Sequence, residues 1–188
     1  LTHSAAAGDN AGRTLARERF SAGERKRVTV LFADIRGSTS LIEKLDPEVA
    51  RKHFDPVLRI MMDAVHRYGG TVNQVLGDGI MALFGAPLAL QDHAVRAGYA
   101  ALAMQDEIRR AAAPESAANR GAIRIGVGIN SGEVVVRSLT NDTNIDYSAL
   151  GQTTHLAARL EEQASAGTIL MSAETLREVE GFFQVTPL

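Results

Sequence analysis

The stretch TVNQVLGDGIMALFG, Thr71 to Gly85, consists of two apolar runs separated by Gly77-Asp78-Gly79. Asp-Gly between two apolar runs is a strong signal for a β-hairpin, because glycine accepts the positive φ that tight turns require. We therefore predict two antiparallel strands that are joined by a tight turn at Asp78.

The segments on either side of this hairpin predict one strand and two helices. RVTVLFADI, Arg27 to Ile35, is apolar and β-branched and predicts a buried strand. A helical region is expected from about Ser38 to Gly69-Gly70, and Pro56 is expected to kink it or to mark a break just before it. Asp92 to about Arg110 predicts an alanine-rich helix. The apolar positions at helical spacing are Val57, Leu58, Ile60, Met61, Ala64, Val65 and Tyr68, and then Ala94, Ala97, Ala101, Met104 and Ile108.

The C-terminal third predicts further strands around one long helix. AIRIGVGINSGEVVVRSL, residues 122–139, is expected to form two strands that meet at Asn130-Ser131-Gly132, followed by a polar excursion over residues 140–150. GQTTHLAARLE, residues 151–161, is expected to run from a loop into a helix, and GTILMS and FFQVTPL predict two closing strands around a short helix. Helices interleaved with an antiparallel-rich sheet indicate an α+β fold, a ferredoxin-like βαββαβ sandwich with extra C-terminal elements.

The composition is that of a globular domain without special affinity for polyanions or lipid. The chain has 188 residues, 45% of them hydrophobic, a net charge of −2 and no cysteine. These values predict no nucleic-acid partner and no membrane contact, and they exclude disulfides, so we expect a cytoplasmic protein. We expect one domain over residues 26–188. Residues 1–25 are expected to be a linker or N-terminal leader with a short helix around Thr14 to Phe20, and the initial Leu suggests a piece of a longer chain.

Two carboxylates are expected to lie close together in this fold. Asp34 ends the first strand and Asp78 lies at the hairpin tip, and in a βαββ unit the hairpin packs beside the first strand. Taken singly, each aspartate suits an ordinary turn or helix cap better than a site. Together they predict bound Mg²⁺ or Mn²⁺, because two close carboxylates repel unless a cation lies between them. The small residues Gly37, Ser38 and Thr39 predict a phosphate-binding loop before a helix.

Between about Arg25 and the C-terminus, four stretches of the chain match the motifs of a known protein family, in the order and spacing that the family shows. They are VTVLFADIRGST, GTVNQVLGDGIMALFGAP, INSGEVVV and DYSALGQTTHLAARLEEQASAGTILMS. In these stretches the chain resembles the catalytic domain of class III nucleotidyl cyclases, the adenylate and guanylate cyclase family. It is especially similar to bacterial cyclase domains that occur within longer multidomain proteins, which implies a fold of class III cyclase type for residues 26–188.

The resemblance implies an adenylate cyclase that converts ATP to 3′,5′-cyclic AMP and pyrophosphate at active sites shared by a head-to-tail homodimer. Asp34 and Asp78 match the family's metal-binding aspartates, and Ile35 would contribute its backbone carbonyl, which implies two Mg²⁺ or Mn²⁺ ions per active site. Arg159 of the other subunit matches the arginine that stabilises charge on the transition state.

Three positions depart from the family's usual pattern. Gln74 stands where adenylate cyclases usually carry the lysine that reads adenine, and Ser148 stands where its partner is usually Asp or Thr. His155 stands where an asparagine usually orients the ribose, one helical turn before Arg159, and would donate one hydrogen bond while titrating near neutral pH. Because a glutamine amide both donates and accepts, we expect ATP to be preferred and GTP to be used appreciably.

Two other interpretations remain open. The first is a weakly active or silent cyclase-like domain that binds nucleotide or dimerises within a signalling protein; Gln74 and His155 favour it, whereas Arg159 and the aspartates oppose it. The second is a diguanylate cyclase or polymerase palm, whose Gly-Gly-Asp-Glu-Phe run is missing from the sequence. Arg36 is a further candidate for phosphate contact. Surface or helix-end positions are expected for His53, His66 and His93.

Overall fold

A six-stranded sheet forms the centre of the computed structural model, which describes residues 24–38, 47–111, 123–141 and 144–188. The strands are β1 (Glu24–Ile35), β2 (Thr71–Leu76), β3 (Gly79–Phe84), β4 (Ile125–Asn141), β5 (Asn144–Leu150) and β6 (Ile169–Met171). The helices are α3 (Pro47–Arg67), α4 (His93–Ala111), α5 (Gln152–Gln163) and α6 (Ala173–Glu178). The sheet order is β2-β3-β1-β4-β5, and β6 pairs with a separate part of β4.

The first six elements confirm the predicted ferredoxin-like βαββαβ order. They run β1, α3, β2, β3, α4 and β4, and β1 lies between β3 and β4, antiparallel to both. The predicted hairpin is present as β2 and β3, with Gly77 at a φ of +66° in its turn. β5, α5, β6 and α6 are the extra C-terminal elements. Residues 1–23 lie outside the described part of the chain, so the short helix and the domain boundary expected there stay predictions.

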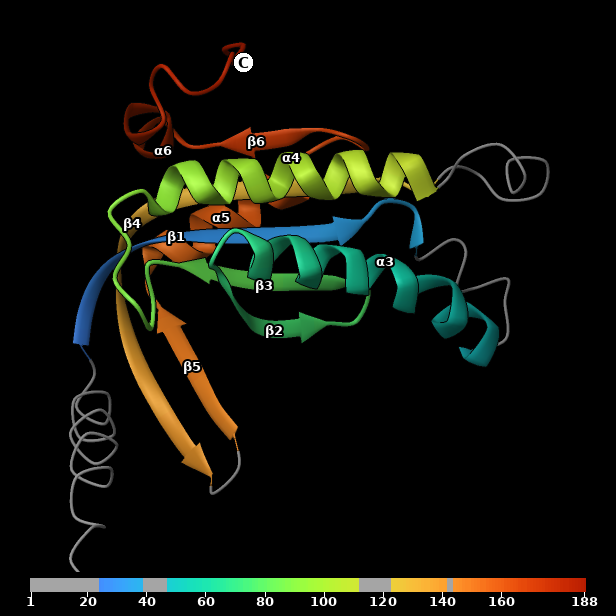
Figure 1. Ribbon diagram of the computed structural model, residues 1–188, viewed down its shortest axis with the longest axis horizontal. Helices are drawn as coiled ribbons and strands as arrows, with labels where there is room; N and C mark the ends of the chain where they lie inside the picture. The colour runs from blue at the N-terminus through green and yellow to red at the C-terminus, as the bar shows by residue number, and fades with distance from the viewer. Residues whose placement is uncertain (1–23, 39–46, 112–122, 142–143) are drawn as a thin grey trace, which may run out of the picture.

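The two faces of the sheet are covered by different helices (Figure 1). Alternate residues of a strand point to opposite faces, and in β1 Leu31, Ala33 and Ile35 pack with α3 and α4. Val28 and Val30 point the other way and pack in a second cluster with Ala157 of α5. The side chains of α4 that were predicted to share one face are all buried. The sheet is therefore the middle layer, and among the described helices α5 covers the face opposite α3 and α4.

Helix α3 runs through Pro56 without ending, so a break at that proline is the wrong alternative. A proline inside a helix removes one hydrogen bond and costs about 3 kcal/mol in helix stability. The buried side chains Phe54, Val57, Leu58 and Met61 lie on both sides of it and pack on the sheet. Burial of an apolar side chain contributes roughly 1.5–3 kcal/mol, so tertiary packing outweighs the local cost.

The predicted pair of strands meeting at Asn130 is wrong, because β4 continues through this point as one strand. Asn-Ser-Gly suits a turn locally, but each residue has a tertiary partner. The side chain of Asn130 donates to the backbone oxygen of Thr153 at 2.9 Å, and the hydroxyl of Ser131 lies 2.8 Å from that of Thr29. A Cβ on Gly132 would lie 2.6 Å from Oγ1 of Thr153. These contacts favour an extended chain over a turn.

Two further sequence predictions differ from the structure near the C-terminus. The expected polar excursion over residues 140–150 contains β5, because β5 pairs along the far half of β4 from Asn144 to Leu150. The expected final strand FFQVTPL does not form, and none of the described strands pairs with it. Pairing with a neighbour stabilises a strand more than local propensity does, and this accounts for both differences.

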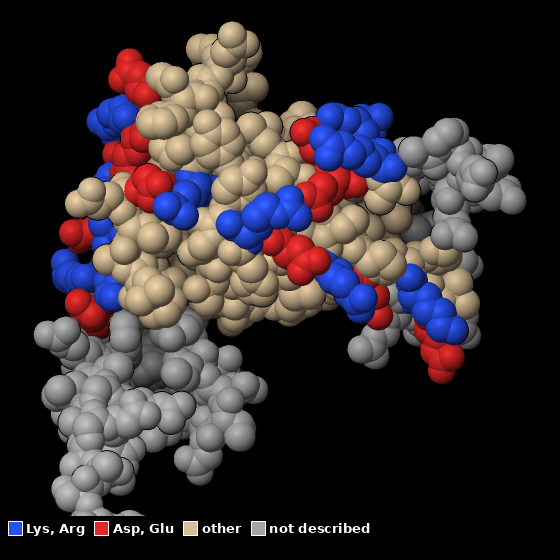
Figure 2. Space-filling model, in the orientation of Figure 1, with Lys and Arg blue, Asp and Glu red and all other residues tan. Residues whose placement is uncertain are grey.

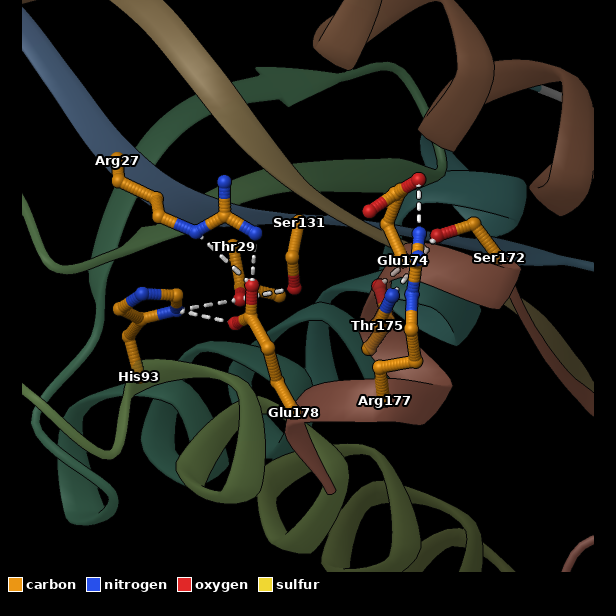
Figure 3. Close-up of polar contacts among 9 residues, drawn as sticks. All are labelled: Arg27, Thr29, His93, Ser131, Ser172, Glu174, Thr175, Arg177 and Glu178. Carbon is orange, nitrogen blue, oxygen red and sulfur yellow. Dashed lines mark hydrogen bonds and ion pairs between the residues drawn. The ribbon is translucent and has the colours of Figure 1, made fainter. Parts of the chain in front are cut away.

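His93 is the first residue of α4, which confirms the helix-end alternative, but its side chain is buried and so is not at the surface. Its Nδ1 lies 2.8 Å from Oγ1 of Thr29 and 3.6 Å from a carboxylate oxygen of Glu178, which also forms an ion pair with Arg27 (Figure 3). Thr29 in turn contacts Ser131. Burial lowers the pKa of His93 below its ordinary value, although Glu178 opposes the shift. This cluster attaches the first turn of α4 and the end of α6 to the centre of the sheet.

Charged side chains of both signs alternate over the face shown in Figure 2. Exposed ion pairs among the described residues include Arg67–Glu107, which joins α3 to α4, and Arg109–Asp106 within α4. Water and salt screen such exposed pairs, so they add little to stability. Within the described ranges, no helix is both long enough and apolar enough to cross a membrane.

Candidate active site

The structure brings Asp34 and Asp78 together at one end of the sheet. Asp34 is the last residue but one of β1 and is paired in register with Gly79, which directly follows Asp78 in the hairpin turn. By strand alternation its carboxylate points to the α5 face. A Cβ on Gly79 would lie 2.7 Å from Oδ1 of Asp34, so the missing side chain makes room for this carboxylate against the hairpin.

The electrostatics of this pair favour a bound cation. Burial raises the pKa of Asp34, the negative charge of Asp78 raises it further, and Arg36 opposes the increase. Carboxylate oxygens are hard ligands that suit Mg²⁺ and Mn²⁺, and a nearby dication would remove the repulsion between them. The residues present therefore fit the cations that the sequence implies.

The described residues alone supply too few ligands for a closed metal site. Across the described residues, no group of three or more His, Cys, Asp or Glu side chains is placed to hold a metal ion. Magnesium sites that act on nucleotides usually combine one or two carboxylates with water and substrate phosphates. Two carboxylates match that kind of open site, and the backbone carbonyl of Ile35, the residue after Asp34, is the further ligand that the family resemblance implies.

The loop that follows β1 is only partly described. Gly37 has a φ of +77°, which favours glycine, and the side chain of Ser38 is buried. Thr39, the third residue of the expected phosphate loop, lies outside the described residues. The chain therefore turns sharply two residues after Ile35, and the phosphate role of this loop stays a prediction.

Gln74 is exposed on β2, next to an irregularity in the hairpin. The register between β2 and β3 shifts between Val72 and Gln74, and the intervening Asn73 donates from Nδ2 to the sulfur of Met81 at 3.7 Å. Gln74 pairs with Met81, which packs on the α5 face. Such a bulge changes the direction of the neighbouring side chains. Ser148 lies in β5 opposite Arg137, and only its backbone is described.

Arg159 and His155 both lie on exposed positions of α5. Residues four apart share a helix face, so the two side chains emerge together. Neither side chain forms a hydrogen bond or an ion pair with the described part of the chain, and so neither is joined to Asp34 or Asp78 in this way. Within one copy of the chain, the carboxylate pair and Arg159 are therefore not linked by such a contact.

Helix α5 lies against a row of glycines in β4 that the sequence analysis did not single out. Gly126, Gly128 and Gly132 are two or four residues apart and face α5. A Cβ on Gly128 would lie 2.2 Å from the backbone nitrogen of Glu161 and 2.3 Å from the backbone oxygen of Ala157. The backbones of helix and strand are therefore in direct contact, which fixes the height of α5 above the sheet. The alternating glycines in IGVGINSG are the sequence signal for this contact.

This α+β sheet, with a carboxylate pair where β1 meets the hairpin and an exposed arginine on α5, has the form of a class III nucleotidyl cyclase domain. The chain belongs to that family, since the adenylate and guanylate cyclase catalytic domain matches residues 20–187.

Relatives in this family include cyclases named for either purine. The guanylyl cyclase Cya2 has a crystal structure that is 34% identical, with a TM-score of 0.81 over 88% of this chain and 84% of that one. The adenylyl cyclase CyaB from P. aeruginosa is 34% identical, with a TM-score of 0.78 over 85% and 83%. Adenylate cyclase 1 of Rhizobium meliloti is 28% identical over 166 residues, which are 87% of this chain and 25% of that protein. The chain spans about a quarter of the length of the curated relatives it matches.

Proposed function

We propose that this domain is an adenylate cyclase that converts ATP to 3′,5′-cyclic AMP and pyrophosphate, with relaxed purine selectivity. The observation that carries the proposal is the placement of Asp34 beside Asp78, where burial and the neighbouring charge raise the pKa of Asp34. A carboxylate pair of this kind is unfavourable unless it binds cations, and turn formation at Asp78 does not require Asp34 to lie beside it.

The cation site in this proposal uses the carboxylates of Asp34 and Asp78 and the backbone carbonyl of Ile35. When bound there, two Mg²⁺ or Mn²⁺ ions would lower the pKa of the ribose 3′-hydroxyl and balance charge on the phosphates. The 3′-oxygen then forms a bond to the α-phosphorus, the bond from that phosphorus to the pyrophosphate oxygen breaks, and the hydroxyl proton is released. Gly37, Ser38 and Thr39 are proposed to contact the phosphates.

Arg159 is proposed to act on the nucleotide held by a second copy of the chain. Its exposure and its lack of an ion pair with the described residues leave the guanidinium available to another chain. Three large apolar side chains are also exposed, Val75 and Leu76 on β2 of the hairpin and Leu156 on α5. Burial of apolar surface between two copies would stabilise a homodimer, and the shared site would then join both half-sites.

Gln74 and Ser148 are proposed to contact the purine. A lysine only donates hydrogen bonds, which suits an acceptor on adenine, whereas a glutamine amide donates and accepts and so suits either purine. Replacement of Gln74 by lysine should therefore raise the ATP to GTP ratio of kcat/KM by about tenfold, which corresponds to about 1.4 kcal/mol in transition-state stabilisation. Initial rates with each nucleotide measure this ratio.

A matched control for this replacement is Gln184→Lys, which adds the same charge at an exposed position in the C-terminal segment. The control should leave the ratio unchanged. If Gln74→Lys also leaves it unchanged, Gln74 does not read the base.

His155 is proposed to donate a hydrogen bond to a ribose oxygen. An asparagine amide can donate the same bond, so His155→Asn should keep kcat within about tenfold of the parent, whereas His155→Ala should lower kcat further. Initial rates of the parent and of both variants provide the measurement. Equal rates for His155→Asn and His155→Ala would exclude this hydrogen bond.

A nucleotide-binding domain with little turnover is the second candidate, and the replacements at Gln74 and His155 favour it. Assays with ATP and GTP side by side, in Mg²⁺ and in Mn²⁺, separate the two candidates. Cyclic AMP as the main product supports the cyclase. If a dimeric sample with intact Asp34 and Asp78 forms no cyclic nucleotide, the binding domain is the correct candidate.

A further inference from the structure

We propose that Arg36 is a positioning residue that holds the last turn of α5 on the sheet and thereby sets the place of Arg159. This inference rests on the proposed function, because it assigns Arg36 to the half-site that contains Arg159 and not to the half-site that contains Asp34. It differs from the sequence-based expectation that Arg36 contacts phosphate.

Arg36 is attached at both its backbone and its side chain. Its backbone nitrogen donates to the backbone oxygen of Arg124 at 2.8 Å. Its Nη2 lies 2.7 Å from Oε1 of Glu161 and also donates to the backbone oxygen of Glu161. Only 23% of the Arg36 side chain and 13% of the Glu161 side chain are exposed. The guanidinium therefore contacts both the side chain and the backbone of Glu161 through Nη2.

The surface of β4 provides the space for this contact. A Cβ on Gly126 would lie 2.3 Å from both Nε and Nη2 of Arg36, so the guanidinium lies directly against the glycine backbone. Two residues further along β4, Gly128 admits the backbone of Glu161 itself. Arg36 and the helix thus occupy neighbouring positions on one strand, and displacement of one would displace the other.

The charges at this contact favour the same arrangement. The backbone oxygen of Glu161 lies in the last turn of α5, where carbonyl groups carry partial negative charge that a cation stabilises, and it also accepts from the backbone nitrogen of Ala164 at 2.9 Å. Burial raises the pKa of Glu161, and the positive charge of Arg36 opposes that increase. Loss of Arg36 would leave a largely buried carboxylate and a helix end without their cation, and the helix end would move.

Arg159 would move with it, because it precedes Glu161 by two residues on α5. In a shared site, the Arg159 of one chain acts on the nucleotide bound by Asp34 of the other chain. A dimer has two such sites, and removal of Arg36 from one chain should impair only the site to which that chain supplies Arg159. The other site, to which the same chain supplies Asp34, should stay nearly intact.

Mixed dimers test this direction. One chain carries Arg159→Ala and supplies only the carboxylate half, and the other carries Asp34→Asn and supplies only the arginine half, so a mixed dimer has one complete site. Arg36→Ala in the arginine-supplying chain should lower kcat by about tenfold or more with little change in KM, since a shift of about 1 Å can cost a hundredfold. The same change in the carboxylate-supplying chain should alter kcat by less than about twofold at saturating metal.

Two further variants separate positioning from general damage. Gly126→Ala displaces the guanidinium without removing it and should show the same directional loss. Arg109→Ala removes an exposed arginine from a surface pair and should have no effect in either chain. If kcat falls only when Arg36 is replaced in the carboxylate-supplying chain, Arg36 acts on the phosphates. If kcat falls equally when it is replaced in either chain, Arg36 has a general structural role. Either result overturns the proposal. If the mixed sample without any change at Arg36 is inactive, the shared site itself is wrong, and this inference falls with it.

Discussion

Replacement of Asp34 by asparagine should lower kcat by about a thousandfold, because cation-assisted charge stabilisation contributes several kcal/mol. Asparagine keeps the shape of the side chain and removes the charge that would hold a cation beside Asp78. Initial rates at increasing Mn²⁺ concentration provide the measurement, and excess metal should not restore the parent's rate. The matched control is Asp63→Asn, an exposed aspartate of α3, which should keep full activity.

The Asp34→Asn variant should be at least as stable as the parent, although its activity falls. The pKa of Asp34 is raised in the folded state, so the ionised form is less favourable when folded than when unfolded. The contribution of this group to stability is therefore present at a pH below the ordinary carboxyl pKa and is lost as the pH rises through the folded pKa. A neutral side chain avoids that loss, and the Tm at pH 7 without metal should equal or exceed that of the parent. An active variant, or one that unfolds, would contradict the assignment of Asp34.

Replacement of Arg159 by alanine has the second largest expected effect. Removal of a donor that stabilises transition-state charge costs about 2.7–4 kcal/mol, or about 10²–10³-fold in kcat. KM should change little, because the interaction strengthens as charge develops on the phosphate. The Tm should be unchanged, since Arg159 is exposed and forms no ion pair with the described residues. Steady-state kinetics and thermal unfolding of the same preparation test both statements.

Two other arginine variants make this result specific. Arg159→Lys keeps the charge but loses the planar group with its fixed pair of donors, and should retain an intermediate rate. Arg177→Ala, at an exposed pair on α6, should be as active as the parent. Full activity in Arg159→Ala would exclude this arginine from the site, and a lowered Tm would indicate a structural role.

The parts of the fold that depend on local signals are predictable from the sequence. Gly77-Asp78-Gly79 between apolar runs specifies the hairpin, and the βαββ order then places its second strand beside β1, where Gly79 pairs with Asp34. The helical spacing of apolar residues likewise predicts the buried face of α4. In both cases a local pattern identifies the element, and the order of elements along the chain places it.

The parts that depend on distant partners were not predictable in the same way. Asn130 has a turn-forming neighbourhood, and only its contact with Thr153 across 23 residues explains the continuous strand. His93 begins α4 as a helix-end residue, but only the contacts with Thr29 and Glu178 explain why its side chain is buried. The pairing of Arg36 with Glu161 spans 125 residues, and no local pattern indicates it. Tertiary contacts outweigh local propensity at these positions.

The central claim is that two copies of this chain form a cyclase site from Asp34 and Asp78 of one copy and Arg159 of the other. The most direct measurement mixes the two inactive variants, Asp34→Asn and Arg159→Ala, in equal amounts and follows cyclic AMP formation from ATP with Mn²⁺. Random pairing makes half of the dimers mixed, each with one complete site of two, so about a quarter of the parent's activity should return. Activity that stays at the level of the separate variants, in a sample shown to contain mixed dimers, would contradict the shared site.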